Sequence, residues 1–536
     1  MTPQLRNLLK TVCVALGTTS IYWLWLLAPL VTGRHIAVYH WSGPAVELFI
    51  PPTLDFCIFW LLLTALLLLT REPGRLRSVV WCGIIAITPW IAIKNATFLT
   101  NSRINHAFSV TLLSVALLAF VASQVFWKPA WEARFEVVVK FASRLLLLPA
   151  MSGALVLCGV AWFGWQARSL NTEFTTRHTE RTEAAREVKP RIIWILFDEL
   201  SYQQVYERRF AGLSLPAFDA LAAQSTVFTH TVPAGILTEL ILPSMMTGTR
   251  VSTLRSSADG KQLYLRRSKT DAWQRFDEHD SVFQDALNLN YGTAVAGWFN
   301  PYCRILPDVL DRCFWTFGAS ANALTFPRAT FQSNLMTPLM QFVGTGPGYR
   351  IMSFFRRAPR IEQLDAEQHI SDYVYLEAAA DHILDDRSAG FSLIHLPVPH
   401  PFGIYDRKAD KFVTMNASYL DNLALADKLL GHIRGKLEKS GQWDDSTIVV
   451  MGDHSWRTEL FWGGSSLWTK EEEVASHGGK FDDRPAYVVK LPHQQTGARI
   501  DAAFDALETR KLFDALLSQK IRNADDLSAW VKQDGN

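Results

Sequence analysis

"IIWILFDE", residues 192–199, places two acidic residues directly after an unbroken apolar run. A run without polar alternation is typical of a strand that is buried on both faces, as in a parallel sheet. Asp198 and Glu199 follow at the exit of this strand, where their charges repel each other and burial penalises both. Two interpretations are open: an acidic turn that begins the next helix, or a pair of carboxylates that holds a cation.

The rest of the C-terminal part predicts an α/β domain with a largely parallel central sheet, because short apolar runs alternate there with helical patterns. The further candidate strands are residues 294–296, 391–395, 447–451 and 486–490, and residues 417–440 are expected to be helical. Ligands of such sheets collect beyond the carboxyl ends of the strands. We therefore expect the chemistry of this protein at the strand exits.

A second strand exit carries metal-binding side-chain types. The stretch "STIVVMGDHSW", residues 446–456, presents Asp453 and His454 just after an apolar run. Carboxylate and imidazole are ligands that zinc-like or manganese-like ions accept. An Asp-His pair alone is more often part of a turn, but two acidic strand exits in one domain favour a metal site.

A threonine lies at a loop-to-helix junction in "PAGILTELILPSMMTG", residues 233–248. The apolar periodicity after Thr238 predicts a helix that ends at Gly248, so Thr238 is expected near the helix N-terminus. Free backbone amides and the helix dipole stabilise an anion there. Thr238 is therefore either an ordinary N-cap residue or a nucleophile that a nearby metal activates.

The N-terminal third contains five apolar runs that approach the ~20 residues needed to cross a bilayer. They are residues 9–32, 48–70, 78–97, 108–127 and 145–166, and the third is interrupted by Pro89 and Lys94. Nine basic residues lie before the first run, between the second and third, or between the fourth and fifth: Arg6, Lys10, Arg71, Arg75, Arg77, Lys128, Arg134, Lys140 and Arg144. The alternate loops contain only Arg34, Lys94 and Arg103. This bias predicts a cytoplasmic N-terminus in the inner (plasma) membrane and an extracytoplasmic, periplasmic C-terminal domain. No small-residue cleavage site follows the first run, which argues against a cleaved signal peptide.

Composition divides the chain into a transmembrane domain (1–167), a charged juxtamembrane linker (168–189) and a soluble domain (190–536) that begins at Pro190. Only two cysteines, Cys303 and Cys313, follow the apolar runs. Their spacing favours a disulfide in an oxidising compartment, with two unpaired buried thiols as the alternative. The net charge of +2 gives no reason to expect a nucleic-acid partner.

The order of these motifs resembles the alkaline phosphatase/sulfatase superfamily: an acidic strand exit, a threonine at a helix start, a His-Pro segment, and a strand followed by Asp-His. With five spans in front, the chain more closely resembles the membrane-anchored branch, which includes lipid A phosphoethanolamine transferases and lipoteichoic acid synthase. In sulfatases the nucleophile stands nine positions before a Thr-Gly pair, and Thr238 stands nine before Thr247. The resemblance covers the topology and about residues 190–495.

The resemblance implies a role for each matched residue. Thr238 would be the nucleophile that becomes phosphorylated, and it would also be a metal ligand. Asp198, Asp453 and His454 would complete the metal shell, with zinc or manganese as the cofactor. Glu199 stands where sulfatases have a second acid, and it would replace Asp198 as the ligand if the strand register were shifted by one residue.

Three further histidines are candidates for a second metal or for the substrate. His400 lies in "HLPVPHPF", residues 395–402, which resembles the His-Pro segment of the superfamily. His395 begins this segment among apolar neighbours, which favours a core or supporting role over a ligand role. His477 stands where related enzymes have a late histidine before the last strand.

The implied activity is transfer of a phospho-head group, of the phosphoethanolamine or glycerol phosphate type, from a membrane phospholipid to a cell-envelope glycan or lipid-linked saccharide. No nucleotide is needed. The Cys or Ser that sulfatases convert to formylglycine is absent, which argues against sulfate ester hydrolysis. The alternatives are a phosphoric or sulfuric ester hydrolase of the same fold and a non-catalytic glycan-binding relative. Residues 250–390, rich in aromatic and basic side chains, are expected to shape the acceptor pocket.

Overall fold

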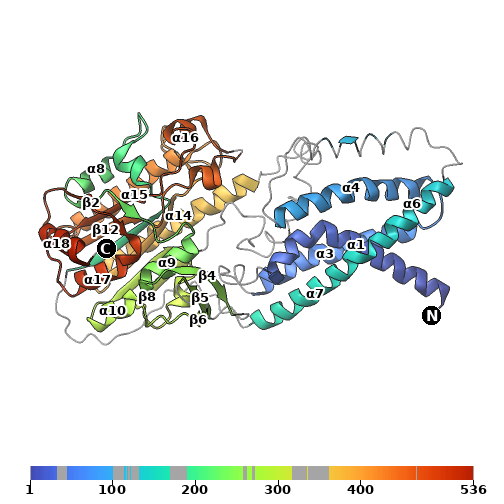
Figure 1. The fold of residues 1–536 in the computed structure, drawn as a ribbon, viewed down its shortest axis with the longest axis horizontal. Helices are drawn as coiled ribbons and strands as arrows, with labels where there is room; N and C mark the ends of the chain where they lie inside the picture. Colours follow the sequence, from blue (N-terminus) through green and yellow to red (C-terminus); the bar gives the residue numbers. More distant parts are fainter. Residues whose placement is uncertain are drawn as a thin grey trace. The chain divides into compact units, whose positions relative to one another are not determined.

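The computed structural model of this chain describes residues 2–32, 45–99, 111, 114–115, 118, 121, 132–168, 190–257, 262–268, 272–316, 335, 361–465 and 467–534. These residues form two compact units (Figure 1). One unit contains the helices up to Ala167, and the other contains the elements from β1 onward. The charged linker predicted for residues 168–189 lies almost entirely outside the described residues.

The N-terminal unit is helical throughout its described part. Its helices are α1 (Pro3–Thr32), α3 (Ala45–Leu69), α4 (Arg75–Leu99), α6 (Glu132–Leu145) and α7 (Leu147–Ala167). Three helical segments are long and apolar enough to cross a membrane: Phe49–Leu69, Arg75–Ile93 and Arg134–Gln166. They coincide with the second, third and fifth predicted spans.

The other two predicted spans are not among these three segments. Residues 9–32 lie in α1, which is helical but is not one of the three candidate spans. Most of residues 108–127 lies outside the described residues. Three candidate spans are therefore supported, while the five-span topology and its orientation remain predictions.

The second unit is built around one eight-stranded sheet with the order β14-β2-β13-β12-β1-β9-β7-β8. The strands are β1 (Ile192–Asp198), β2 (Thr226–Phe228), β7 (Thr293–Trp298), β8 (Arg312–Thr316), β9 (Phe391–Pro399), β12 (Thr447–Gly452), β13 (Tyr487–Lys490) and β14 (Ala498–Ile500). The run from β12 to β8 is parallel, whereas β13 is antiparallel to both of its neighbours. The expected α/β domain with a largely parallel sheet is thus confirmed, as are its five predicted strands.

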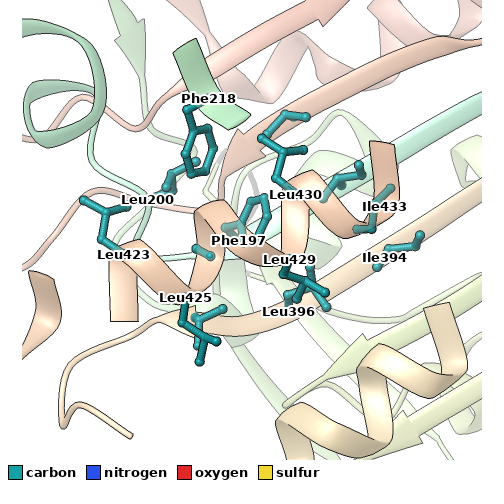
Figure 2. Packing of buried hydrophobic residues seen from close by; sticks show 14 of the residues in the cluster. Phe197, Leu200, Phe218, Ile394, Leu396, Leu423, Leu425, Leu429, Leu430 and Ile433 are labelled. Atoms are coloured by element: carbon teal, nitrogen blue, oxygen red, sulfur yellow. The ribbon is translucent and has the colours of Figure 1, made fainter. Parts of the chain in front are cut away.

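Helices cover both faces of this sheet, which explains why its strands are apolar on both sides. On one face, α14 (Ile361–Asp385) and α15 (Tyr419–Lys439) pack on β9, and α8 (Pro216–Ala222) packs on α15. Phe197 of β1 and Leu429 of α15 belong to the same buried hydrophobic cluster in this part of the core (Figure 2). On the other face, the ring of Trp194 lies 4.9 Å from that of Phe513 in α17 (Thr509–Leu517).

Smaller elements lie outside the eight-stranded sheet. The remaining strands are β3 (Thr231–Val232), β4 (Val251–Ser256), β5 (Leu263–Arg267), β6 (Trp273–Arg275), β10 (Tyr405–Asp406), β11 (Lys411–Phe412) and β15 (Phe504–Asp505). The remaining helices are α9 (Thr238–Thr247), α10 (Val282–Asn288), α11 (Tyr302–Ile305), α16 (Lys470–Ala475) and α18 (Ala524–Asp534), with short helical turns at Gln203–Glu207, Thr458–Trp462 and Ala506–Glu508. Strands β4, β5 and β6 form a separate antiparallel sheet.

Candidate metal and nucleophile site

The two acidic strand exits meet because β1 and β12 are parallel neighbours in the sheet. Asp198 ends β1 and Asp453 follows β12 directly, and both side chains are buried. The backbone between them is tight: a Cβ atom on Gly452 would lie 2.6 Å from the carbonyl oxygen of Leu200. Only glycine fits there, so the chain can turn sharply and present Asp453 at the end of β1.

Thr238 joins these carboxylates from the start of α9. Its hydroxyl donates a hydrogen bond of 2.8 Å to Asp453 Oδ2 and lies 3.5 Å from Asp198 Oδ2. The N-cap residue of α9 is Leu237, with no side-chain cap, and Thr238 is the first helical residue. The hydroxyl therefore points at the acidic pair and does not cap the helix.

His454 completes a group of four side chains. Its Nδ1–H donates to the carbonyl oxygen of Ser455 at 3.0 Å, which leaves Nε2 as the acceptor nitrogen, 3.4 Å from the hydroxyl of Thr238. Nε2 lies 3.3 Å from Asp453 Oδ2 and 3.8 Å from Asp198 Oδ1. Burial lowers the pKa of His454 to about 3, so the ring is neutral, as a metal ligand must be.

This donor set fits a divalent cation. One ligand atom from each of Asp198, Asp453 and His454 lies within 4.8 Å of the other two. Asp198 Oδ1 is buried and receives no hydrogen bond within the described part of the chain. Burial, reinforced by the neighbouring acid, raises the pKa of Asp198 well above its ordinary value, and burial also raises that of Asp453. The two buried carboxylates repel each other, and Nε2 of His454 offers a lone pair beside them. A cation bound by these three side chains would offset the repulsion.

Glu199 is held differently from Asp198. Its backbone has a φ of 64°, a left-handed conformation that is costly for a residue with a Cβ atom. The turn directs its fully buried carboxylate toward Arg457, whose Nε donates to Oε1 at 2.8 Å and whose Nη2 also contacts Oε1. The backbone N–H of Arg457 and the indole N–H of Trp462 donate to the same carboxylate at 3.0–3.1 Å. Glu199 thus already has a cationic partner within the protein.

His400 lies beside this ion pair. Its Nδ1–H donates to the carbonyl oxygen of Pro401 at 2.9 Å, and its Nε2 is 3.9 Å from Glu199 Oε1. Atoms of Asp198, Glu199 and His400 form a second group that is compact enough to hold an ion. Burial lowers the pKa of His400 well below its ordinary value, so this ring is also neutral.

Among the described residues, neither of the other two predicted histidines belongs to these two groups, although His395 is close enough to Asp453 to interact with it electrostatically. His395 is buried in β9, where its Nδ1 lies 2.7 Å from the hydroxyl of Tyr302, and burial lowers its pKa to about 4. His477 is exposed in the loop after α16 and belongs to neither candidate metal group among the described residues. The roles assigned to these side chains remain predictions.

Two functional candidates had no signal in the sequence. Arg457 and Trp462 lie after the Asp-His pair, in the segment that leads into and through a short helical turn, and their partner Glu199 is more than 250 residues away. Asn300 is a weaker case, since its side chain donates to the backbone carbonyl of Thr238 at 3.4 Å. Cys303 and Cys313 form a disulfide that links α11 to β8.

The comparisons with known proteins agree with this fold. The chain belongs to the Sulfatase family, whose model matches residues 190–492. None of the curated proteins matches the chain.

Solved structures similar to this chain include members of the alkaline phosphatase superfamily. Ps i-CgsB in complex with k-i-k-neocarrahexaose is 18% identical, with a TM-score of 0.41, and the match covers 63% of this chain and 74% of that one. The phosphonate monoester hydrolase of Agrobacterium radiobacter is 15% identical, with a TM-score of 0.38 and coverage of 62% and 74%. The lipoteichoic acid synthase LtaP of Listeria monocytogenes is 14% identical, with a TM-score of 0.36 and coverage of 66% and 78%.

Proposed function

We propose that this protein is a metal-dependent transferase that moves a phospho-head group from a membrane phospholipid to a cell-envelope glycan through a phospho-threonine intermediate. The observation that carries the proposal is the convergence on Thr238. Its hydroxyl lies within 3.5 Å of Asp198, Asp453 and His454, in a buried site that suits a divalent cation. Thr238 also belongs to a helix N-terminus, where backbone amides favour a phosphate anion.

In the first step, Thr238 Oγ1 attacks the phosphorus of a phosphodiester. The bond from phosphorus to the diacylglycerol oxygen breaks, and a bond from phosphorus to Oγ1 forms. Asp453 Oδ2 already accepts the hydroxyl hydrogen at 2.8 Å, so the proton of Thr238 has an acceptor in place. The leaving alkoxide takes up a proton from solvent as it departs from the buried site. In the second step, an acceptor hydroxyl attacks the phosphorus of the phospho-threonine and releases its proton to solvent, the bond from phosphorus to Oγ1 breaks, and Oγ1 takes its proton back from Asp453.

When a divalent ion is held by Asp198, Asp453 and His454, it supplies Lewis-acid stabilisation of the negative charge on the phosphoryl oxygens. The surrounding groups orient the ligand side chains and limit the access of water. The Nδ1–H bond of His454 to Ser455 fixes the ring with Nε2 toward the acids. Burial of all four side chains keeps water away from the reacting group.

A lipid donor is supported by an apolar rim beside the nucleophile, formed by Ile236, Leu460 and Phe461. Their exposed fractions are 44%, 47% and 43%, which is unusual for large apolar side chains beside a polar site. Arg457 joins the rim to the site, because its Nη1 donates to the carbonyl oxygen of Ile236 and its guanidinium lies 4.7 Å from the centre of the Phe461 ring. Acyl chains next to a bound head group would cover such a surface.

The test is the intact mass and metal content of the full chain after incubation with mixed phospholipids. We expect a bound divalent metal and a mass adduct in the wild type, and no adduct in Thr238→Ala. The mass of the adduct identifies the head group. Protein without metal or adduct in any lipid mixture would point to a non-catalytic binding relative.

A hydrolase of the same fold would form the same adduct and pass it to water. An added glycan acceptor separates the two activities: a transferase yields a modified glycan, whereas a hydrolase yields only the free head-group phosphate. Sulfate ester hydrolysis is disfavoured by the threonine at position 238, which replaces the Cys or Ser that sulfatases convert to formylglycine.

A further inference from the structure

The separate sheet of β4, β5 and β6 has one apolar and one basic face. Leu254, Leu263 and Leu265 are buried on one face. Cross-strand register places Arg255, Tyr264 and Arg275 in one row on the opposite face. A second row on that face contains Thr253, Arg266 and Trp273. We call these six residues the arginine face.

Aromatic rings hold the guanidinium groups of this face. The guanidinium carbon of Arg255 lies 4.2 Å from the ring centre of Trp273 and 5.7 Å from that of Tyr264. Arg266 lies 5.4 Å from the same Trp273 ring. Stacking on a ring restricts an arginine while its N–H edge still faces outward, so less entropy is lost when it binds an anion.

Two arginines of this face, Arg255 and Arg275, have no carboxylate partner among the described residues. Arg255 and Arg275 are exposed, and no described carboxylate forms an ion pair with either of them. By contrast, Arg250 and Arg267, which lie at the ends of the same strands, pair with Asp505 and Asp280. None of the described residues in the three strands is a large apolar side chain with high exposure, so the face is not built to enter a bilayer.

The sheet is directly attached to the nucleophile helix. Strand β4 packs on α9, as Figure 1 shows, and the backbone N–H of Val251 donates to Ser244 Oγ of that helix at 2.8 Å. Arg250 Nη1 also donates to the carbonyl oxygen of Ala234, in the loop that leads to Thr238. A ligand on the arginine face is therefore bound by an element that contacts the catalytic helix.

We propose that the arginine face binds an anionic saccharide, through bidentate contacts of Arg255 and Arg275 with its phosphate or carboxylate groups. The proposal rests on the transferase function, because it gives the glycan acceptor a docking surface. Arg255 and Arg275 lie in one row and pair with no described carboxylate, so together they match an anion with more than one charged oxygen. Because no described residue of the three strands is a highly exposed large apolar side chain, the face favours a soluble polar chain over a lipid surface.

The test uses the full chain with the Thr238→Ala substitution, in phosphatidylcholine nanodiscs, so that no turnover consumes the ligand. Binding of phosphorylated pentamannose is measured by calorimetry and compared with the same oligosaccharide after removal of its phosphate. We expect binding of the phosphorylated form only, weakened about tenfold by Arg255→Gln with Arg275→Gln. The Arg→Lys pair at these positions should weaken binding less, because it keeps the charges and loses only the fork geometry.

The matched control is Arg499→Gln with Arg522→Gln, two exposed arginines that are not on this face and whose loss gives the same net charge. We expect this control to bind within twofold of the parent protein. Equal weakening in the control, equal affinity for the dephosphorylated sugar, or no binding at all would overturn the proposal. So would phosphatidylglycerol vesicles that bind through Arg255 and Arg275 while the saccharide does not. Because the assay needs no catalysis, its failure is distinct from failure of the adduct experiment.

Discussion

Replacing Arg457 with methionine would leave the Glu199 carboxylate buried with no cationic partner in contact. The Glu199 side chain has no exposed surface, and that of Arg457 is 9% exposed. Methionine keeps the backbone N–H bond to Glu199 and the packing on Trp462, but it removes the guanidinium donors. Removing one partner of a buried ion pair costs about 3–5 kcal/mol, because the other charge stays in a poorly solvating environment. We expect a loss of unfolding free energy of that size.

The assay is urea unfolding of the detergent-solubilised full chain, followed by tryptophan fluorescence in the presence of a chelator so that no bound cation contributes. Arg484→Met serves as the control. Its side chain is 17% exposed and pairs with Glu207, which is 38% exposed, and with Asp482, which is 17% exposed. Both carboxylates keep contact with water after the substitution, so we expect a loss of at most about 2 kcal/mol. Glu199→Gln combined with Arg457→Met should cost less than Arg457→Met alone, because no isolated charge remains. A loss below about 1 kcal/mol in Arg457→Met would refute the buried-pair argument.

Three further predictions concern metal, pH and the apolar rim. Asp198→Ala should lose the bound metal in elemental analysis, whereas His477→Ala should retain it, since His477 is exposed and outside both candidate groups; equal loss in both would contradict the assignment. Burial lowers the pKa of His369 from 6.5 to about 4, so the unfolded state takes up a proton first as the pH falls. This histidine should lower the unfolding free energy by about 2 kcal/mol between pH 8 and pH 5, and His369→Gln should lack that part of the pH dependence in parallel urea titrations. Phe461→Ser should reduce turnover of long-chain phospholipid but not of a short-chain analogue, while Phe412→Ser, with a similar exposed fraction, should change neither.

The part of the site that lies on the main sheet was predictable from the sequence, for a simple reason. Apolar runs identified β1 and β12, and parallel neighbours bring their carboxyl ends to one edge, so Asp198 and Asp453 had to lie close together if the strands were adjacent. Thr238 required one more step, because nothing in its local pattern shows that α9 begins beside that edge. Thr238 was assigned to the site only because the order of the motifs resembles that of the alkaline phosphatase/sulfatase superfamily.

The rest of the site could not be predicted because it depends on contacts without periodicity. Arg457 follows Asp453 closely in sequence, but its pairing with Glu199 exists only in three dimensions. The irregular register between β1 and β9, in which Phe197 faces Leu396 and the next residue faces Pro399, also leaves no trace in the apolar pattern. The sheet of β4, β5 and β6 was also not predicted, because its strands are short and carry consecutive polar residues.

The hydrogen bond from Thr238 to Asp453 spans 215 residues of chain. At a synthesis rate of about 5–20 residues per second, the ribosome makes the threonine roughly 10–40 s before it makes the acid. During that interval Thr238 is an ordinary hydroxyl, with neither its proton acceptor nor His454 in existence. The proposed reactivity therefore requires β12 to insert beside β1, so a chain that stalls or is cut before this strand would contain the proposed nucleophile without its proton acceptor or its metal ligands.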